Sequence, residues 1–145
     1  MTTLRNVSPR ASRGFTLLEL LVVMVILGLL VGYVAPKLFS QVGKSEVKSA
    51  RAQIGALEKA LDLYRLDTGH YPSTDGGLKA LIAKPDSEPK WNGPYLQKAV
   101  PADPWGHPYQ YKQPGEHGDF DLWSFGKDGQ AGGEGENEDL GNWQQ

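Results

Sequence analysis

The chain has 145 residues, a formal net charge of −2, 18 glycines, 10 prolines and no cysteine. This length indicates one domain with room for an anchor, and the charge offers no basic surface for nucleic acid. The lack of cysteine excludes disulfides, zinc–cysteine sites and a cysteine nucleophile. Most glycines and prolines lie at or after Gly69, which predicts a loop-rich C-terminal half.

The first predicted element is an apolar helix from Phe15 to Ala35, in which Glu19 is the one charged residue. At about 1.5 Å per residue this stretch spans roughly 30 Å, the thickness of a bilayer core. A cleaved secretory signal has a shorter apolar core of about 7–15 residues and an A-x-A-like site, for which Val34-Ala35-Pro36 is a poor match. A buried helix of a soluble domain needs more covering chain than follows here. We therefore expect a membrane helix.

The charges around this segment predict its orientation. The charged residues before Phe15 are Arg5, Arg10 and Arg13, whereas those from Asp128 onward are all acidic. Basic residues ahead of an apolar run favour an N-terminus in the cytoplasm and a C-terminus across the membrane.

Glu19 needs an explanation because an acid at the centre of a membrane helix costs about 2.5–3.5 kcal/mol. It lies near the cytoplasmic end, so one interpretation is a tolerated interfacial acid. The other is that it awaits a cation. Cleavage between Gly14 and Phe15 would create an α-amine four residues before Glu19, able to pair with this carboxylate in the same chain or a neighbour.

The stretch RGFTLLELLVVMVILGLL resembles the class III signal of type IV pilins and type II secretion pseudopilins. The shared pattern is a short basic leader ending in glycine, then phenylalanine, then a glutamate four residues later in an apolar helix. The resemblance implies cleavage after Gly14 and N-methylation of Phe15, both by a prepilin peptidase. It also implies that Glu19 pairs with the N-terminal amine of a neighbouring subunit during assembly.

Beyond the apolar segment, Pro36 is expected to interrupt the helix. The sequence then becomes amphipathic, with apolar residues at alternating steps of three and four, until Gly69 stops it. This stripe is either the core face of the C-terminal half or a coiled-coil seam; we favour the core face because later aromatic residues need a surface to pack on. Its members are Val47, Ala50, Ile54, Leu57, Leu61 and Tyr64.

The C-terminal half predicts a small mixed domain. HYPSTDGGLKALIAKP indicates a loop and a short helix capped by Ser73, Thr74 or Asp75. PYQYK and DFDLWSF are strand candidates joined by the hairpin loop QPGEHGD. An antiparallel sheet packed on the stem makes an α+β domain. The side chains expected to face inward from the short helix are Leu78, Leu81 and Ile82.

LDTGHYPSTDGGLKALI, DPWGHPYQY and FGKDGQAGGEGENEDLGNW are similar to the body of the general secretion protein G family, the major pseudopilins of type II secretion. With the anchor, the similarity covers nearly all of the chain after Arg13. It implies a type IV pilin-like α+β fold. The expected parts are a leader over 1–14, a transmembrane or filament-core helix over 15–36, an amphipathic stem over 37–68 and a periplasmic domain over 69–145.

Residues 125–143, named here the tail loop, hold an acidic, glycine-rich stretch without a basic residue from Asp128 to Asp139. The spacing is not that of an EF-hand, and composition alone favours a solvated loop. The resemblance instead implies one bound calcium ion. By position, the implied ligands are the Asp128 and Asp139 side chains, then Asn137, the Phe125 and Gln130 carbonyls, and after them Glu138 and Glu136, with Glu134 a weaker candidate.

No enzymatic constellation stands out in the sequence. His70, His107 and His117 each lie in turn-like sequence, and none is at metal-ligand spacing with another. Asp119 and Asp121 alternate on one predicted strand, which indicates a solvent-facing edge. We therefore expect no catalytic activity.

The resemblance implies a major structural subunit of a periplasmic pseudopilus, a filament that drives export of folded proteins across the outer membrane. Before assembly the subunit is expected in the bacterial inner membrane, single-pass, with its C-terminal domain in the periplasm. The implied partners are further copies of itself, the prepilin peptidase, minor pseudopilins, an inner-membrane assembly platform and an outer-membrane secretin, but not nucleic acid. The alternatives are a type IV pilin or minor pseudopilin, and a membrane-anchored periplasmic binding or enzymatic domain.

Overall fold

The computed structural model describes residues 14–144, so the predicted leader lies outside the described residues except for Gly14. Helix α1 (Leu17–Thr68) is followed by strands β1 (Gln110–Lys112), β2 (Asp121–Ser124) and β3 (Leu140–Gly141). Short 3-10 helices lie at Gly77–Leu81, Gly135–Asn137 and Asn142–Gln144. The chain divides into two compact units between Phe39 and Ser40, and each is described by itself.

In the first unit the helix is not covered by any other part of the chain that the structure describes. The large apolar side chains from Leu17 to Phe39 are all exposed, with Leu18 and Leu29 at 71% and Phe39 at 75%. The expectation that Pro36 interrupts the helix is wrong, because α1 continues through it. Proline removes one backbone hydrogen bond, but the helix continues in the turns on either side of it.

In the second unit the predicted stripe faces the core. Ala50, Ile54, Leu57, Leu61 and Tyr64 are buried, and Val47 packs against them at the edge. The core interpretation of the stripe is therefore confirmed. The helix ends at Thr68, where Gly69 takes a φ of +88° and its N–H bonds to the Arg65 carbonyl, a glycine C-terminal stop.

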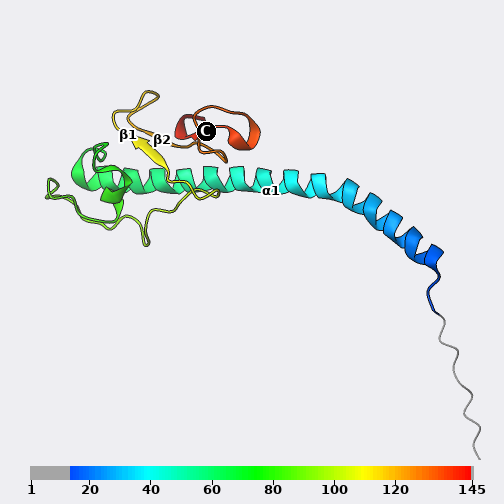
Figure 1. Ribbon diagram of the computed structural model, residues 1–145. Coiled ribbons are helices and arrows are strands. Elements are labelled where there is room, and N and C mark those ends of the chain that lie inside the picture. The colour runs from blue at the N-terminus through cyan, green and yellow to red at the C-terminus, as the bar shows by residue number, and fades with distance from the viewer. Residues whose placement is uncertain (1–13, 145) are drawn as a thin grey trace, which may run out of the picture. The chain divides into compact units, whose positions relative to one another are not determined.

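The sheet packs on this face of α1 (Figure 1). Its order is β1-β2-β3, with all pairs antiparallel and Tyr111 opposite Leu122. The predicted hairpin and the α+β class are confirmed, whereas the two-residue β3 was not predicted. The apolar residues that the sheet and the loops contribute to the buried core are Leu78, Ala80, Leu81, Tyr109, Phe120, Leu122 and Leu140.

The predicted short helix is the 3-10 helix Gly77–Leu81, with Leu78 and Leu81 buried and Ile82 half-buried. No side chain caps the first turn of this helix, so the expected capping of the helix itself is wrong. Of the three predicted capping residues, Ser73 accepts the Gly76 N–H through Oγ at 3.4 Å, in the turn just before the helix. Thr74 instead exchanges two hydrogen bonds of 2.9 Å with the backbone of Gln113 and ties this loop to the end of β1.

Candidate functional site

The N-terminus of α1 is closed by a reciprocal pair of hydrogen bonds between Thr16 and Glu19. The Thr16 N–H and hydroxyl donate to Glu19 Oε2 at 2.8 and 2.9 Å, and the Glu19 N–H donates to Thr16 Oγ1 at 3.1 Å. This is a capping box. The T-x-x-E spacing ahead of an apolar run carried that signal, and sequence reasoning directed at the charge of Glu19 missed it.

The capping box holds the Glu19 carboxylate against the peptide that follows Phe15. Gly14 and Phe15 precede the helix and are exposed, Phe15 at 86%. The Gly14–Phe15 bond is therefore outside regular structure, as a peptidase requires. An α-amine created at Phe15 would lie one residue before Thr16, whose N–H already donates to the Glu19 carboxylate.

Among the described residues, one helix is long and apolar enough to cross a membrane, and it is α1. The apolar window in it is not buried by any other part of the described chain. Such a surface requires lipid or neighbouring protein as its environment.

The tail loop leaves β2 after Ser124 and returns at β3. Its two sides are joined where the Lys127 N–H donates to the Glu136 carbonyl at 2.9 Å. The Lys127 ammonium also pairs with the Glu136 carboxylate at 2.6 Å, and this hydrogen bond raises the pKa of Lys127. The Glu136 side chain lies against Gly43 of α1, where a Cβ would overlap it. The Glu136 carboxylate is thus engaged by a cation and by the stem.

Asp128 and Asp139 are the first and last residues of the acidic stretch of the tail loop. Asp128 Oδ1 accepts the Gln130 N–H at 3.1 Å, and Asp139 Oδ2 accepts the Gly132 N–H at 2.9 Å. Asp139 Oδ1 is the one buried side-chain polar atom among the described residues without a hydrogen-bond partner. A buried carboxylate oxygen left unpaired is costly, which points to a group that binds there.

The other predicted ligands lie on the same loop. Asn137 is half-buried and its carbonyl lies against Gly133, while Gln130, Glu134 and Glu138 are exposed. Phe125, half-buried, begins the loop and packs edge-on against Trp123 at 5.9 Å between ring centroids.

These residues can be tested for their fit to calcium, a hard cation that takes carboxylate, amide and carbonyl oxygens. No group of three or more His, Cys, Asp or Glu side chains in the described part of the chain is arranged to hold a metal. A site here must therefore draw on backbone carbonyls besides its carboxylates. The loop supplies them, and the unpaired Asp139 oxygen supplies an anchor, so the donor set fits the ion.

The described histidines pair with acids rather than with a nucleophile. His70 Nε2 lies 2.8 Å from the buried Glu88, and His117 Nδ1 lies 3.0 Å from Asp121. Asp121 is itself buried and also accepts the N–H groups of Glu116 and His117, so the predicted solvent-facing edge is wrong at this residue. The alternation of side chains along a strand does not predict which face of the strand an adjacent turn covers, and here the turn before Asp121 covers its carboxylate.

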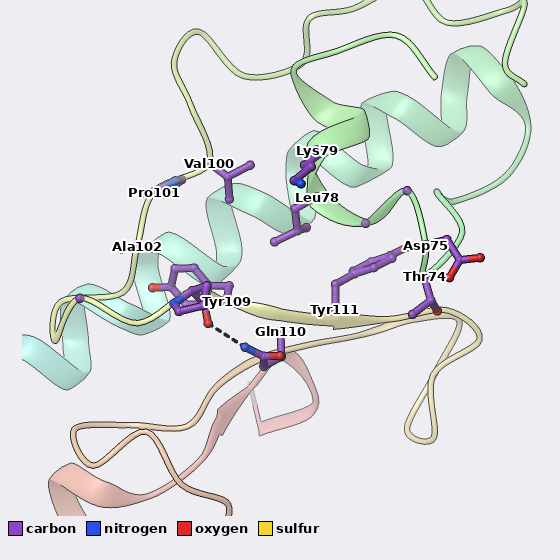
Figure 2. A pocket seen from close by; sticks show the side chains of 14 residues that line it. Thr74, Asp75, Leu78, Lys79, Val100, Pro101, Ala102, Tyr109, Gln110 and Tyr111 are labelled. Atoms are coloured by element: carbon purple, nitrogen blue, oxygen red, sulfur yellow. Dashed lines mark hydrogen bonds between the residues drawn. The ribbon is translucent and has the colours of Figure 1, made fainter. Parts of the chain in front are cut away.

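The hollow beside β1 has a volume of about 510 Å³ and is mainly apolar (Figure 2). Leu78, Tyr109 and Tyr111 line it, and its charged residues are Asp75 and Lys79. None of the described histidines lines it. The hollow has no paired acid and base, and nothing in it indicates a reaction.

Known protein families match both units of the chain. Residues 9–35 match a family described as the prokaryotic N-terminal methylation motif, and residues 37–143 match one described as type II secretion system (T2SS), protein G. The chain is 47% identical over 137 residues to the type II secretion system core protein G of Pseudomonas aeruginosa, covering 92% of this chain and 96% of that protein. It is 49% identical over 137 residues to the core protein G of Vibrio cholerae, covering 92% and 93%.

A solved structure is similar to the fold as well. It is the crystal structure of the major pseudopilin from the type 2 secretion system of enterohaemorrhagic Escherichia coli. The TM-score is 0.63 and the identity 38%, with 76% of this chain and 96% of that chain covered.

Proposed function

The chain belongs to the type II secretion protein G family, and from this premise we propose how it is processed, anchored, assembled and stabilised. It is a major pseudopilus subunit with a type IV pilin-like fold, which confirms the resemblance seen in the sequence. The family consists of structural subunits of secretion machinery that assemble into the pseudopilus. The subunit is anchored in a membrane by α1.

The proposed processing is cleavage between Gly14 and Phe15 and N-methylation of Phe15 by a prepilin peptidase. The match of residues 9–35 to the methylation motif and the exposure of this peptide bond support it. The leader arginines support an inner-membrane, single-pass orientation with the C-terminal domain in the periplasm.

The proposed assembly step is pairing of the Glu19 carboxylate with the Phe15 amine of a neighbouring subunit. The observation that carries it is the uncovered apolar part of α1, whose one acid is held at the helix N-terminus by Thr16. In a packed helical array a lone charge is penalised, so pairing sets the register between copies. Minor pseudopilins, the assembly platform and the secretin are the proposed further partners, and export of folded proteins across the outer membrane is the proposed outcome.

Replacing Glu19 by Ala and by Gln separates its two roles. Gln at this position can still complete the capping box but carries no charge. We predict that both variants insert in the membrane and that both fail to form filaments, measured by chemical cross-linking of neighbouring subunits in intact cells that express the parent or a variant. Filaments formed by Glu19→Gln but not by Glu19→Ala would show that Glu19 serves only as a helix cap.

We further propose that the tail loop binds one calcium ion through Asp128, Asp139 and Asn137 together with loop carbonyls. When bound, the ion would supply the positive charge that neutralises these carboxylates. The buried, unpaired Asp139 Oδ1 supports this, as does the acidic, glycine-rich chain around it. Glu136, paired with Lys127, is better placed to offer its carbonyl than its carboxylate.

Calcium binding should stabilise the full-length protein in detergent. At a calcium concentration about one hundred times Kd, the free energy of unfolding should rise by about 2.7 kcal/mol, raising the thermal midpoint. Asp139→Ala should abolish this rise, whereas Glu134→Ala, which changes an exposed acid of the same loop, should retain it. A calcium-dependent rise that survives Asp139→Ala would place the ion elsewhere.

We infer no catalytic role for the chain. The buried acids of the described part hold backbone N–H groups, histidines or hydroxyls, as in the Asp121 and Glu88 clusters. The alternatives considered from sequence are a type IV pilin or minor pseudopilin and an anchored binding or enzymatic domain. No observation favours either of them over the major pseudopilus subunit.

A further inference from the structure

Asp103 is a buried carboxylate that neither assembly nor calcium ligation accounts for. It lies between Ala102 and Pro108, which form an isolated antiparallel bridge, and its side chain is fully buried. Oδ1 accepts the N–H groups of Trp105 and His107 at 3.1 and 2.8 Å. Burying a carboxylate is expensive unless it is well bonded, so this residue must hold something in place.

Its other oxygen reaches the start of the tail loop. The Ser124 hydroxyl at the end of β2 donates to Asp103 Oδ2. Ser124 Oγ in turn accepts the Gly126 N–H at 3.1 Å. Two hydrogen bonds in sequence therefore connect the Asp103 carboxylate to the second residue of the tail loop.

A second connection runs through His107. Its Nδ1 lies 3.2 Å from the Gly126 carbonyl, to which it can donate, and its ring lies against Gly129. Asp103 fixes this histidine through its backbone N–H. Both the N–H and the carbonyl of Gly126 are thus held by groups that Asp103 orients.

Gly126 is where the returning side of the tail loop packs. Its φ is +70°, and a Cβ there would lie within 2.9 Å of the Glu136 and Glu138 carbonyl oxygens. The position of Gly126 therefore fixes residues 136–138, which lead directly into Asp139 and its unpaired oxygen.

We propose that Asp103 is a positioning residue for the calcium site: without touching the ion, it presets the tail-loop carbonyls and Asp139 through Ser124, His107 and Gly126. This inference rests on the proposed calcium binding. Groups that orient metal ligands typically change metal affinity by about 10- to 100-fold when they are replaced.

The test measures calcium affinity by isothermal titration of the full-length protein in detergent. Asp103→Asn keeps one oxygen for Trp105 and His107 but presents an amide N–H₂ to Ser124, whose hydroxyl must turn away. We expect Kd to rise by about 10- to 100-fold while near-UV circular dichroism shows retained side-chain packing. Ser124→Ala, with Asp103 intact, is a second variant that should weaken binding in the same way.

Asp121→Asn is the matched control. Asp121 is also buried and also accepts two backbone N–H groups and one side-chain group, but its partner His117 reaches the tail loop at Trp143, beyond the proposed ligands. It should lower thermal stability and leave Kd within about twofold of the parent. Asp103→Asn is expected to act through Ser124. The double variant Asp103→Asn/Ser124→Ala should therefore bind calcium no more than about twofold more weakly than the weaker-binding of the two single variants.

The outcomes separate the two proposals. A parent protein that binds calcium with the same Kd as Asp103→Asn and Ser124→Ala overturns the positioning role and leaves the calcium site standing. The positioning role is also overturned if Asp121→Asn weakens binding as much as those two variants do. If the parent itself does not bind calcium, the calcium proposal fails and the positioning role falls with it. If Asp103→Asn fails to fold, Ser124→Ala and the control decide the question.

Discussion

Asp121 shows how a single buried carboxylate contributes to stability. Burial raises its pKa, but the hydrogen bonds from Glu116 and from the backbone and ring of His117 together outweigh burial, so the pKa lies below its ordinary value. The bonds to the ionised form are charge-assisted and stronger than neutral ones. Asp121 thus belongs to the fold rather than to a reaction.

A pH-dependent difference in stability follows from that lowered pKa. A group whose pKa is depressed by folding contributes stability above its unfolded pKa, about 3.9 for Asp, and loses it as the pH falls through the folded value. Asp121→Asn should therefore unfold at a lower temperature than the parent at about pH 6. The gap should narrow below about pH 4, as calorimetry at a series of pH values can show. A gap of constant size down to about pH 2 would contradict this account.

At the level of residues, the sequence was enough to identify candidate acidic residues but not the groups they hydrogen-bond to in the fold. Glu19 and the acids of the tail loop were found because charge in an apolar or glycine-rich setting is conspicuous. The roles of Thr16 and Asp103 were missed, although T-x-x-E is a recognisable spacing. Asp103 bonds to Ser124, 21 residues away, and pairing at such separation is decided by folding alone.

At the level of elements, helix α1 carries different surfaces along its length. One is uncovered and apolar; the other, in the second unit, bears the buried stripe and Gly43. Gly43 is buried beneath the Glu136 side chain, so this turn of the helix has no room for a Cβ. The glycine lets the tail loop and the Lys127–Glu136 pair lie directly on the stem.

Gly43→Ala should accordingly displace Glu136 and destabilise the second unit by about 1–3 kcal/mol. Gly55→Ala is the matched control: it lies on the same helix with nothing within 4 Å of the new Cβ and should be stabilising by about 1 kcal/mol. Chemical denaturation measures both.

Adding Glu136→Ala to Gly43→Ala removes the overlap and should recover most of the loss. A Gly43→Ala protein as stable as Gly55→Ala would mean that the loop does not rest on Gly43.

Periodicity predicted the stem face correctly because its apolar residues repeat over about five helical turns. It gave no sign of β3, a strand of two residues, Leu140 and Gly141, which pair with β2. The expectation that Pro36 interrupts the helix was wrong because the local preference of proline against a helix interior did not end a helix that continues on both sides of it.

At the level of the whole molecule, the chain combines an anchor that needs lipid or neighbours with a compact unit that carries its own core. Under the proposed assembly step, its role in a pseudopilus depends on a change made after synthesis, because the amine proposed to pair with Glu19 would form only on cleavage between Gly14 and Phe15. Assembly would therefore depend on the proposed conversion of an inserted precursor into a subunit with a free, methylated Phe15.

The most direct test is the intact mass of the protein purified from membranes of its native cell. Loss of Met1–Gly14 together with the gain of one methyl group on Phe15 is the predicted result, with fragmentation placing the methyl on the N-terminal nitrogen. An uncut chain in a cell with an active prepilin peptidase would contradict the account, since Glu19 would then have no amine to meet.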